Sequence, residues 1–428
     1  MNEKKRNRLD FLQNMLIVAL SLFTVVLLTQ TQLYELGSTV LRQNFGSLLE
    51  PSAADSNTDE AAVIPATPVH VAVSGAYGRY GDMTLVSSDE DFRPLGDLLK
   101  EALGSARTAS ACTQAEFLDA LNSTSIYYDF LTDLPLSVLA ELTGTSTENS
   151  LSVRRIVLSD RDSQGVCLFL QDENGGYQVC STAVSRGDLE TATGGYELGN
   201  AVFAFELAET EGSYVAVDPC SLFLTDSASA LPVLLTEDVP ADTSQTLTVL
   251  QFNPRTNYRY PESDGTEVIV EGERSLRIHP DGTLLYRSGG EHVLTIDAAN
   301  SAAPTLQEAV AGTGALLQRL ASDSGDAQLY LQNLQQSGDT ITLRFGFHAN
   351  GIPIRFSDDT CAAEVTLTGS TVSTLSLRFR RYTVSSESSL LLPLRQALAI
   401  AASGSGAELS VGYADNGAGQ LAACWLAD

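Results

Sequence analysis

The sequence is poor in the residue types from which many catalytic sites are built. Beyond residue 33, Lys100 is the only lysine, which leaves little basis for a Ser-Lys dyad. His70, His279, His292 and His348 are scattered, with no i,i+4 pair, which argues against a metal site or a histidine general base. The chain also lacks the GxSxG, GxxxxGK[ST] and HExxH patterns. We therefore predict no enzyme activity and no catalytic, metal or cofactor-binding residues, although chance pairs of carboxylates keep hydrolysis open as a third-ranked hypothesis.

The six cysteines include no CxxC pair, which argues against a zinc or redox site. Cys167 and Cys180 flank CLFLQDENGGYQVC, whose turn at 174–176 predicts a hairpin with two adjacent strands. This pair is the best candidate for a disulfide, and Cys361 with Cys424 is a weaker one. Isolated buried thiols are the alternative, because spacing alone does not fix connectivity.

Positive charge is scarce in this chain. It has 25 Lys and Arg against 53 Asp and Glu, a formal net charge of −28. Such a surface repels the phosphates of nucleic acids, so we expect no nucleic-acid partner. The acidic clusters at 88–91 and 358–359 lack the ligand spacing of a calcium loop, and we interpret them as solvated turns.

One long apolar run is present, FLQNMLIVALSLFTVVLLTQTQL at residues 11–33, and it holds no charge. A helix of roughly 20 such residues crosses the ~30 Å hydrocarbon core of a bilayer. Basic residues outnumber acidic ones in residues 1–10, so the positive-inside rule places the N-terminus in the cytoplasm and the bulk of the chain outside. The sequence thus predicts a single-pass cell-membrane protein. A cleavable signal peptide is the alternative, but residues 29–34 lack an A-x-A-like site.

Polar residues in this run gather on one side of the predicted helix. Gln13, Asn14, Ser21 and Thr24 fall within an arc of about 100° when successive residues turn by roughly 100°. Polar side chains within a bilayer tend to face another helix, so these four are candidate partner contacts. The alternative is that Gln13 lies at the membrane interface and that Ser21 and Thr24 bond to their own backbone.

Beyond the run, the patterns predict an α+β fold of antiparallel sheets with packed helices. We expect a juxtamembrane helix and linker at 34–68, then α+β, β-rich and α+β domains at 69–195, 196–300 and 301–428. Helices are expected over 95–103, capped by Ser88 or Asp91, and after a capping box at Thr113 and Glu116. Alternation and turn residues from 266 to 296 predict a four-stranded meander.

Three parts of the chain, in order, resemble the YycH family and its YycI relatives. They are SIYYDFLTDLPLSVL at 125–139, FNPRTNYRYPESDGTEVIVEGERSLRIHPDGTLLY at 252–286, and NGIPI at 350–354 with RFRRYT at 378–383. The family's proteins have one transmembrane helix and an exported multidomain part. The resemblance implies contact with an essential two-component sensor histidine kinase that governs cell-wall metabolism. It also suggests a YycI-like partner and regulation through the transmembrane helices.

A second hypothesis is an anchored module that binds a cell-wall fragment or a peptide. Arg378, Arg380 and Arg381 lie beside Tyr382 and could meet an acidic ligand. The alternative is that these arginines form an exposed strand face and pair with the abundant carboxylates.

Overall fold

The computed structural model describes residues 66–427, apart from gaps at 150, 162–164, 212–216, 226–230, 240, 254, 256, 291–292, 322–323, 358–359 and 402–407. Residues 62–428 form one compact unit. The run at 11–33, its four candidate contact residues and residues 34–65 of the predicted juxtamembrane helix and linker lie outside the described residues. Within the described part, no helix has both the length and the apolar character needed to cross a bilayer.

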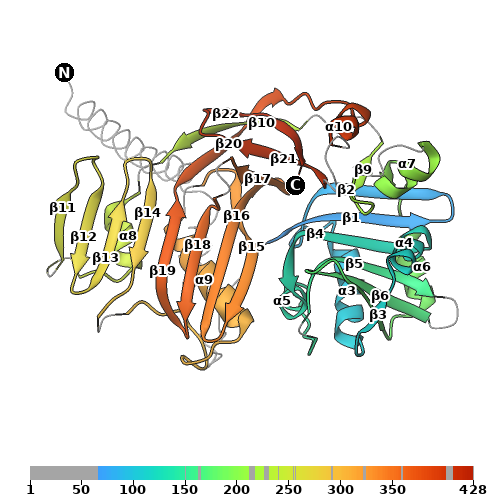
Figure 1. The fold of residues 1–428 in the computed structure, drawn as a ribbon, viewed down its shortest axis with the longest axis horizontal. Helices are drawn as coiled ribbons and strands as arrows, with labels where there is room; N and C mark the ends of the chain where they lie inside the picture. Colours follow the sequence, from blue (N-terminus) through green and yellow to red (C-terminus); the bar gives the residue numbers. More distant parts are fainter. Residues whose placement is uncertain are drawn as a thin grey trace, which may run out of the picture. The chain divides into compact units, whose positions relative to one another are not determined.

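The first half of this unit is built on a seven-stranded antiparallel sheet (Figure 1). Its strands, in spatial order, are β2 Gly78–Val86, β1 Pro68–Gly75, β4 Ser125–Pro135, β5 Ser152–Arg161, β6 Gly165–Asp172, β7 Tyr177–Ser181 and β3 Ser110–Cys112. The predicted hairpin at 174–176 is confirmed as the β6–β7 turn.

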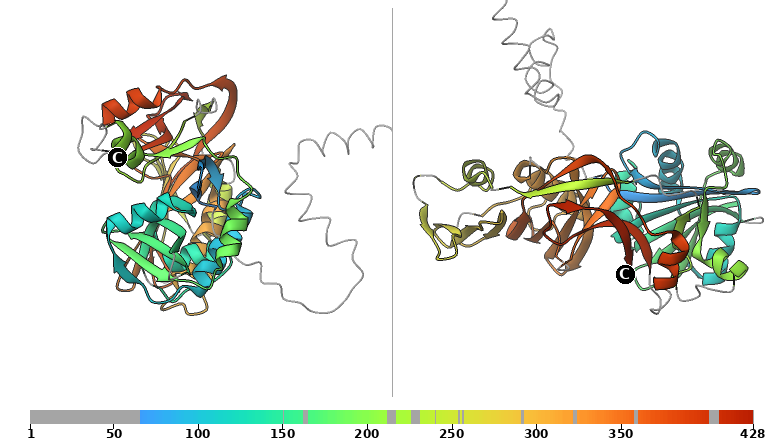
Figure 2. Two further views of the ribbon diagram at one scale, coloured as in Figure 1. Left: turned by 90° about the vertical axis from the view of Figure 1, so that its right-hand side faces the viewer. Right: turned by 90° about the horizontal axis from the view of Figure 1, so that it is seen from above.

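Helices cover both faces of this sheet, as Figure 2 shows. One face packs on α3 Arg93–Ser105, α5 Leu136–Leu142 and α6 Arg186–Thr193. The other face packs on α4 Gln114–Asn122 and on the pair of strands β8 Ala201–Phe203 and β9 Leu222–Leu224. Along the chain, α7 Ala204–Glu211 lies between β8 and β9. Both faces being covered explains why β4, β5 and β6 read as nearly continuous apolar runs.

The second half is built on an eleven-stranded sheet. In spatial order it contains β11 Tyr258–Pro261, β12 Glu267–Glu271, β13 Arg274–Ile278, β14 Thr283–Arg287, β19 Thr371–Arg378, β18 Ala363–Thr368, β16 Thr340–Ala349, β17 Ile352–Phe356, β21 Leu409–Asp415 and β23 Ala423–Ala427, while β15 Ala327–Ser337 pairs with β16. All of these pairings are antiparallel except β17 with β21. The predicted α+β class with mostly antiparallel sheets is therefore confirmed.

Helices α8 Thr243–Val249 and α9 Leu306–Leu320 pack against each other, and α9 contacts β18. Figure 1 shows α9 behind the sheet. A capping box between Thr305 and Glu308 begins α9. Gly312 allows α9 to lie close to Ile296, because a Cβ on this glycine would lie 2.8 Å from Cβ of Ile296.

A third sheet of three strands joins distant parts of the chain. It orders β20 Arg380–Ser388, β10 Pro232–Asp238 and β22 Gln420–Leu421. The chain leaves the large sheet at Phe379, between β19 and β20, so these two consecutive strands belong to different sheets. The last helix, α10 Leu394–Ala401, packs on residues of α7 and β9.

The domain boundary predicted near residue 300 is crossed by two of the sheets. β14 pairs with β19, and β10 pairs with β20, so strands from both sides of that boundary hydrogen-bond to each other. One continuous core also extends from α3 through α5 and α9 to the large sheet. Hairpin signals find strands but carry no information on these long-range pairings, which is why the sequence suggested separate domains.

Several local predictions can be compared with the structure. The capping box at Thr113 and Glu116 is confirmed. The predicted cap of α3 is wrong, because Phe92 occupies that position without a side-chain hydrogen bond. The meander has four strands, but its outer strand is β11 rather than the segment at 292–296, where Thr295 makes only an isolated bridge with Thr371.

Candidate functional site

A buried ionic cluster lies where the regular pairing of β4 with β5 is interrupted after Asp129. Arg154 Nε donates to Asp129 Oδ1 at 2.7 Å and its Nη2 donates to Oδ2 at 3.1 Å. Arg155 Nε reaches the same carboxylate at 3.4 Å. The side chains of Asp129 and Arg155 are almost fully buried. Two consecutive arginines thus share one acidic partner.

An irregularity in β5 explains how both arginines reach Asp129. Adjacent side chains on a regular strand point to opposite faces. The β5–β6 register shifts between Val153 and Arg155, so Arg154 occupies a bulge, which redirects its side chain. The cluster therefore depends on one extra residue in β5.

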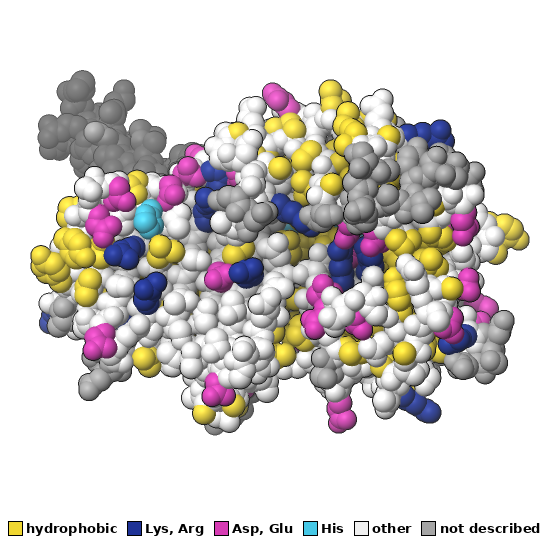
Figure 3. Space-filling view, viewed as in Figure 1, with side chains coloured by type: hydrophobic (Ala, Val, Ile, Leu, Met, Phe, Trp, Pro, Cys, Tyr) yellow, Lys and Arg dark blue, Asp and Glu magenta, His cyan; other side chains and the backbone are white. Residues whose placement is uncertain are grey.

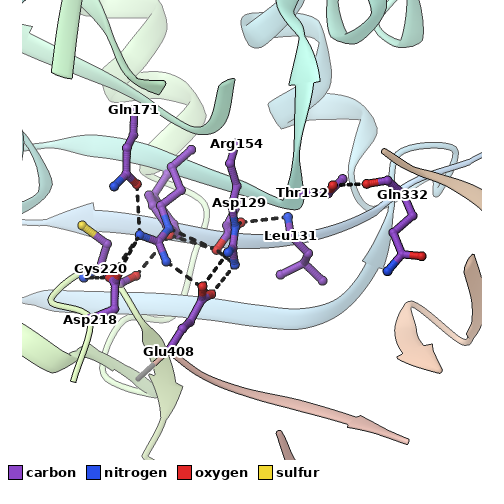
Figure 4. Close-up of polar contacts among 11 residues, drawn as sticks. Asp129, Leu131, Thr132, Arg154, Gln171, Asp218, Cys220, Gln332 and Glu408 are labelled. Carbon is purple, nitrogen blue, oxygen red and sulfur yellow. Dashed lines mark hydrogen bonds and ion pairs between the residues drawn. The ribbon is translucent and has the colours of Figure 1, made fainter. Parts of the chain in front are cut away.

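The cluster extends to two segments that are distant in sequence (Figure 4). Arg154 Nη1 donates to Glu408 Oε2 at 2.5 Å, and Arg155 Nη2 lies 3.3 Å from Glu408 Oε1. Arg155 Nη1 donates to both oxygens of Asp218, at 3.0 and 3.1 Å, and to Gln171 at 3.0 Å. Glu408 directly precedes β21, so these contacts tie the seven-stranded sheet to the C-terminal part.

The charges of this cluster control its protonation. Burial acts to raise the pKa of Asp129, but the positive charges of Arg154 and Arg155 outweigh it and hold that pKa well below its usual value. Burial lowers the pKa of His70, which pairs with Asp129 across β1 and β4, to about 4. Asp129 is therefore ionised, with the neutral imidazole of His70 beside it, at neutral pH.

A polar cleft of about 590 Å³ opens beside the cluster. Arg154 and Glu408 form one wall, and β15 with the strands next to it forms the other. It is lined by Leu131, Thr132, Asp133, Arg154, Tyr330, Gln332, Asn333, Gln335, Arg344, Pro353, Arg355, Thr360, Cys361, Glu364, Ser376 and Glu408.

Both walls of the cleft are shaped by irregular strands. The register of β4 is interrupted between Asp129 and Leu134, and Leu131 has a left-handed φ of 62°. Asp129 Oδ1 accepts a hydrogen bond from the Leu131 backbone at 2.8 Å, which holds this conformation. β15 has its own bulge at Gln332, whose carbonyl accepts a hydrogen bond from the Thr132 hydroxyl (Figure 4). Bulges are common beside binding sites because they redirect side chains.

Three side chains of the cleft have unused hydrogen-bonding capacity. Asp133 is half-buried, and it has no hydrogen bond or ion pair to any residue that the structure describes. Burial raises its pKa. The amide side chains of Asn333 and Gln335 likewise have no described hydrogen-bond partner. By contrast, Arg344 Nε donates to Glu364 at 2.7 Å.

The cleft continues onto the face of the large sheet opposite α9. Register places Arg344, Glu364, Ser376 and Leu285 in one row across β16, β18, β19 and β14. A smaller cavity of about 270 Å³ lies over β13, β14 and β19. Figure 3 shows charged side chains along this face and hydrophobic ones over its β11–β13 end.

At that end, β11 is the outer strand of the sheet as far as the structure describes it. The side chains of Tyr258 and Tyr260 have 69% and 37% of their surface exposed, and their rings lie 5.7 Å apart. Both face the same way as Val268 and Val270 of β12. An exposed strand edge with aromatic side chains is a typical feature of protein-binding surfaces.

The arginines proposed to bind an acidic ligand are engaged within the protein. Arg380 Nε donates to Asp415 at 2.5 Å, and Arg381 Nη1 donates to Glu237 at 2.6 Å. Tyr382 also donates to Asp415, at 2.8 Å. The pairing with carboxylates that we considered is thus present, but Arg380 is buried instead of exposed because it fills the junction of β10, β20 and β21. A cavity of about 370 Å³ does adjoin it.

The proposed disulfide between Cys167 and Cys180 is absent, and all six cysteines are free. Cys180 pairs with Leu168, and Cys167 pairs with Ser181. Side chains of paired residues share a face, so the two thiols lie on opposite faces of the sheet, in different cores. The hairpin prediction was right, but a register offset of one residue separates the sulfurs.

Sequence reasoning did not identify Asp129, Arg154, Arg155 or Glu408. A usable signal was present, since Arg154 and Arg155 interrupt the otherwise apolar strand SVRRIVL and Asp129 interrupts the apolar run SIYYDF. Buried charges of this kind require partners.

Among the described residues, no group of three His, Cys, Asp or Glu is arranged to hold a metal ion. His279 Nδ1 lies 3.0 Å from the Thr266 hydroxyl, and His348 is buried beside Tyr330. Comparison of the chain with protein-family models, with curated proteins and with solved structures gave no match.

Proposed function

We propose that this chain is a membrane-anchored extracytoplasmic protein that regulates a two-component sensor histidine kinase by contact. Two regions would make that contact: the apolar run at 11–33, through Gln13, Asn14, Ser21 and Thr24, and an exposed surface of the folded part. A YycI-like protein is a second partner in this proposal. The kinase controls cell-wall metabolism in the family that the sequence resembles.

The observation that carries the proposal is the exposed edge at β11. The long stretch at 252–286, which bears the family resemblance, folds into β11–β14. The outward side of this segment presents Tyr258 and Tyr260. On the edge strand of a sheet, aromatic side chains supply apolar contact area, and the outer edge of the strand supplies main-chain hydrogen bonds to a partner.

The other two resembling parts support the folded unit itself. The stretch at 125–139 contains Asp129 of the ionic cluster. Asn350 and Gly351 form the β16–β17 turn, where a Cβ on Gly351 would lie 2.1 Å from the Thr84 carbonyl oxygen, so this turn packs directly on β2. Arg380 lies at the three-strand junction. The resembling residues are thus concentrated where the unit is held together.

Site-specific photocrosslinking of the full-length protein in its own membrane tests the proposal. A photoreactive residue at Asn14 or Ser21 should capture the kinase, and one at Tyr258 should capture an extracytoplasmic domain of the kinase or of its partner. Val26 is the matched control, because it lies on the opposite side of the predicted helix. Capture of lipid alone at Asn14, Ser21 and Tyr258 would contradict the proposal.

A second candidate function is a binding module for a cell-wall fragment or peptide. The polar cleft beside Arg154 and Glu408 favours it, since its volume of about 590 Å³ lies within the usual range for ligand sites, about 300–1,000 Å³.

A further inference from the structure

We propose that the cleft between β4 and β15 binds an uncharged oligosaccharide, with Asp133, Asn333 and Gln335 as its hydrogen-bonding residues. This inference rests on the second candidate function, the binding module, and does not require contact with a kinase. It is carried by the charge balance of the cleft, by its unused polar groups and by the shape of its walls.

The charges that line the cleft balance one another. Three arginines, Arg154, Arg344 and Arg355, face three acids, Asp133, Glu364 and Glu408. Arg154 is bonded to Glu408, and Arg344 is bonded to Glu364. These two arginines and two glutamates therefore already neutralise each other in pairs. A strongly charged ligand would have to break these pairs or be repelled by one sign of charge. A neutral ligand meets neither cost.

The unused groups suit hydroxyl groups on the ligand. A carboxylate accepts hydrogen bonds, and an amide side chain both donates and accepts them. A sugar hydroxyl also donates and accepts, so Asp133, Asn333 and Gln335 can each bond to one. The bulges in β4 and β15 place these side chains on the two walls, so that a ligand in the cleft reaches both.

The same walls are less suited to a peptide. Binding of an extended peptide to a sheet requires pockets for alternate side chains along a free strand edge. Here the apolar contribution is limited to Leu131, Pro353 and the buried Tyr330, and the carbonyl of Gln332 is already bonded to Thr132. Most of the remaining lining is polar. An oligosaccharide is therefore the better match.

Calorimetry of the full-length protein in lipid nanodiscs, which carry no sugar headgroups, tests this proposal. The probe is tetra-N-acetylchitotetraose, an uncharged oligosaccharide. The wild-type protein should bind it, and Gln335→Ala and Asp133→Ala should each weaken binding about tenfold, the effect of losing one good hydrogen bond to a ligand. Gln335 is exposed, so its replacement should leave the fold intact, which the fluorescence of Trp425, the single tryptophan, can verify.

Gln336→Ala is the matched control. Gln336 is exposed, adjacent and chemically identical to Gln335, but it pairs with buried Ile341 and faces away from the cleft. Its replacement should leave the affinity for the tetrasaccharide unchanged. Absence of binding at millimolar tetrasaccharide, or equal affinities for Gln335→Ala and Gln336→Ala, would overturn the proposal. So would tighter binding of tetra-alanine or polyphosphate that Gln335→Ala weakens. None of these results would alter kinase capture from Asn14 or Ser21, so the two proposals can fail separately.

Discussion

Arg154 and Glu408 are 254 positions apart in the chain, yet the Arg154 guanidinium donates to the Glu408 carboxylate at 2.5 Å. This bond and the pairing of both neighbouring arginines with Asp129 connect the seven-stranded sheet to the C-terminal segment. The polar cleft opens beside this connection. The ionic cluster therefore has a structural role in shaping the candidate site.

Replacing Asp129 by Asn should strongly destabilise the folded unit. Arg154 and Arg155 would lose their shared anion while remaining buried, and breaking a buried ion pair in this way costs about 3–5 kcal/mol of unfolding free energy. Urea unfolding followed by Trp425 fluorescence measures the change. The control is Glu90→Gln, which removes a pair with Arg93 on an exposed surface and should leave the midpoint unchanged. Equal midpoints for both variants would show that the cluster does not hold the unit together.

The stability of the protein should fall as the pH drops from 6.5 to 4. Burial lowers the pKa of His70 and of His348 to about 4, so between these pH values the unfolded chain binds protons that the folded protein does not. Each of these two pKa shifts corresponds to a loss of about 3 kcal/mol in the free energy of unfolding. Urea midpoints across this range should therefore rise with pH, and His70→Gln together with His348→Gln should flatten the profile. An unchanged slope in the double variant would contradict this assignment.

Asp129 contributes in a more acidic range. Its pKa in the folded protein lies below that of an unfolded aspartate, about 3.9, so its stabilisation is present above that value and is lost as the pH falls further. The histidine and aspartate effects are thus separable by pH.

Gly351→Ala should destabilise the protein more than Gly175→Ala. Both glycines have a left-handed φ, of 77° and 74°, so the backbone cost of alanine is similar. A Cβ at Gly351 would clash with the Thr84 carbonyl, whereas nothing lies within 4 Å of one at Gly175. The melting temperatures of the two variants measure the difference. Equal melting temperatures would indicate that the β16–β17 turn does not pack on β2.

The protein should contain six free thiols. Cys167 and Cys180 are buried on opposite faces of one sheet, and burial raises the pKa of both, to about 11 for Cys180. Alkylation without reductant should therefore be slow in the native protein and should label all six cysteines after denaturation. A peptide in which Cys167 is linked to Cys180 would show that the β6–β7 register differs from the one described.

Local patterns predicted much of the secondary structure, because local physics determines it. The Thr113 capping box and the β6–β7 turn are each specified by residues that lie close together in the chain. The ionic cluster has no such local specification. Asp129, Arg154 and Glu408 come together only through strand pairing, a bulge at Arg154 and the return of the chain to β21, and none of these leaves a short-range pattern in the sequence. The offset that separates Cys167 from Cys180 is hidden for the same reason.

The proposed regulation is tested most directly by purifying the full-length protein from its own membrane, alongside a variant in which Gln13, Asn14, Ser21 and Thr24 are all replaced by Leu. The replacements keep the run apolar, so the variant should still reach the membrane. We predict that a sensor histidine kinase copurifies with the wild-type protein and that the variant retains much less of it. Recovery of the wild-type protein without any kinase, or of a mature form whose N-terminus begins after Leu33, would contradict the proposal.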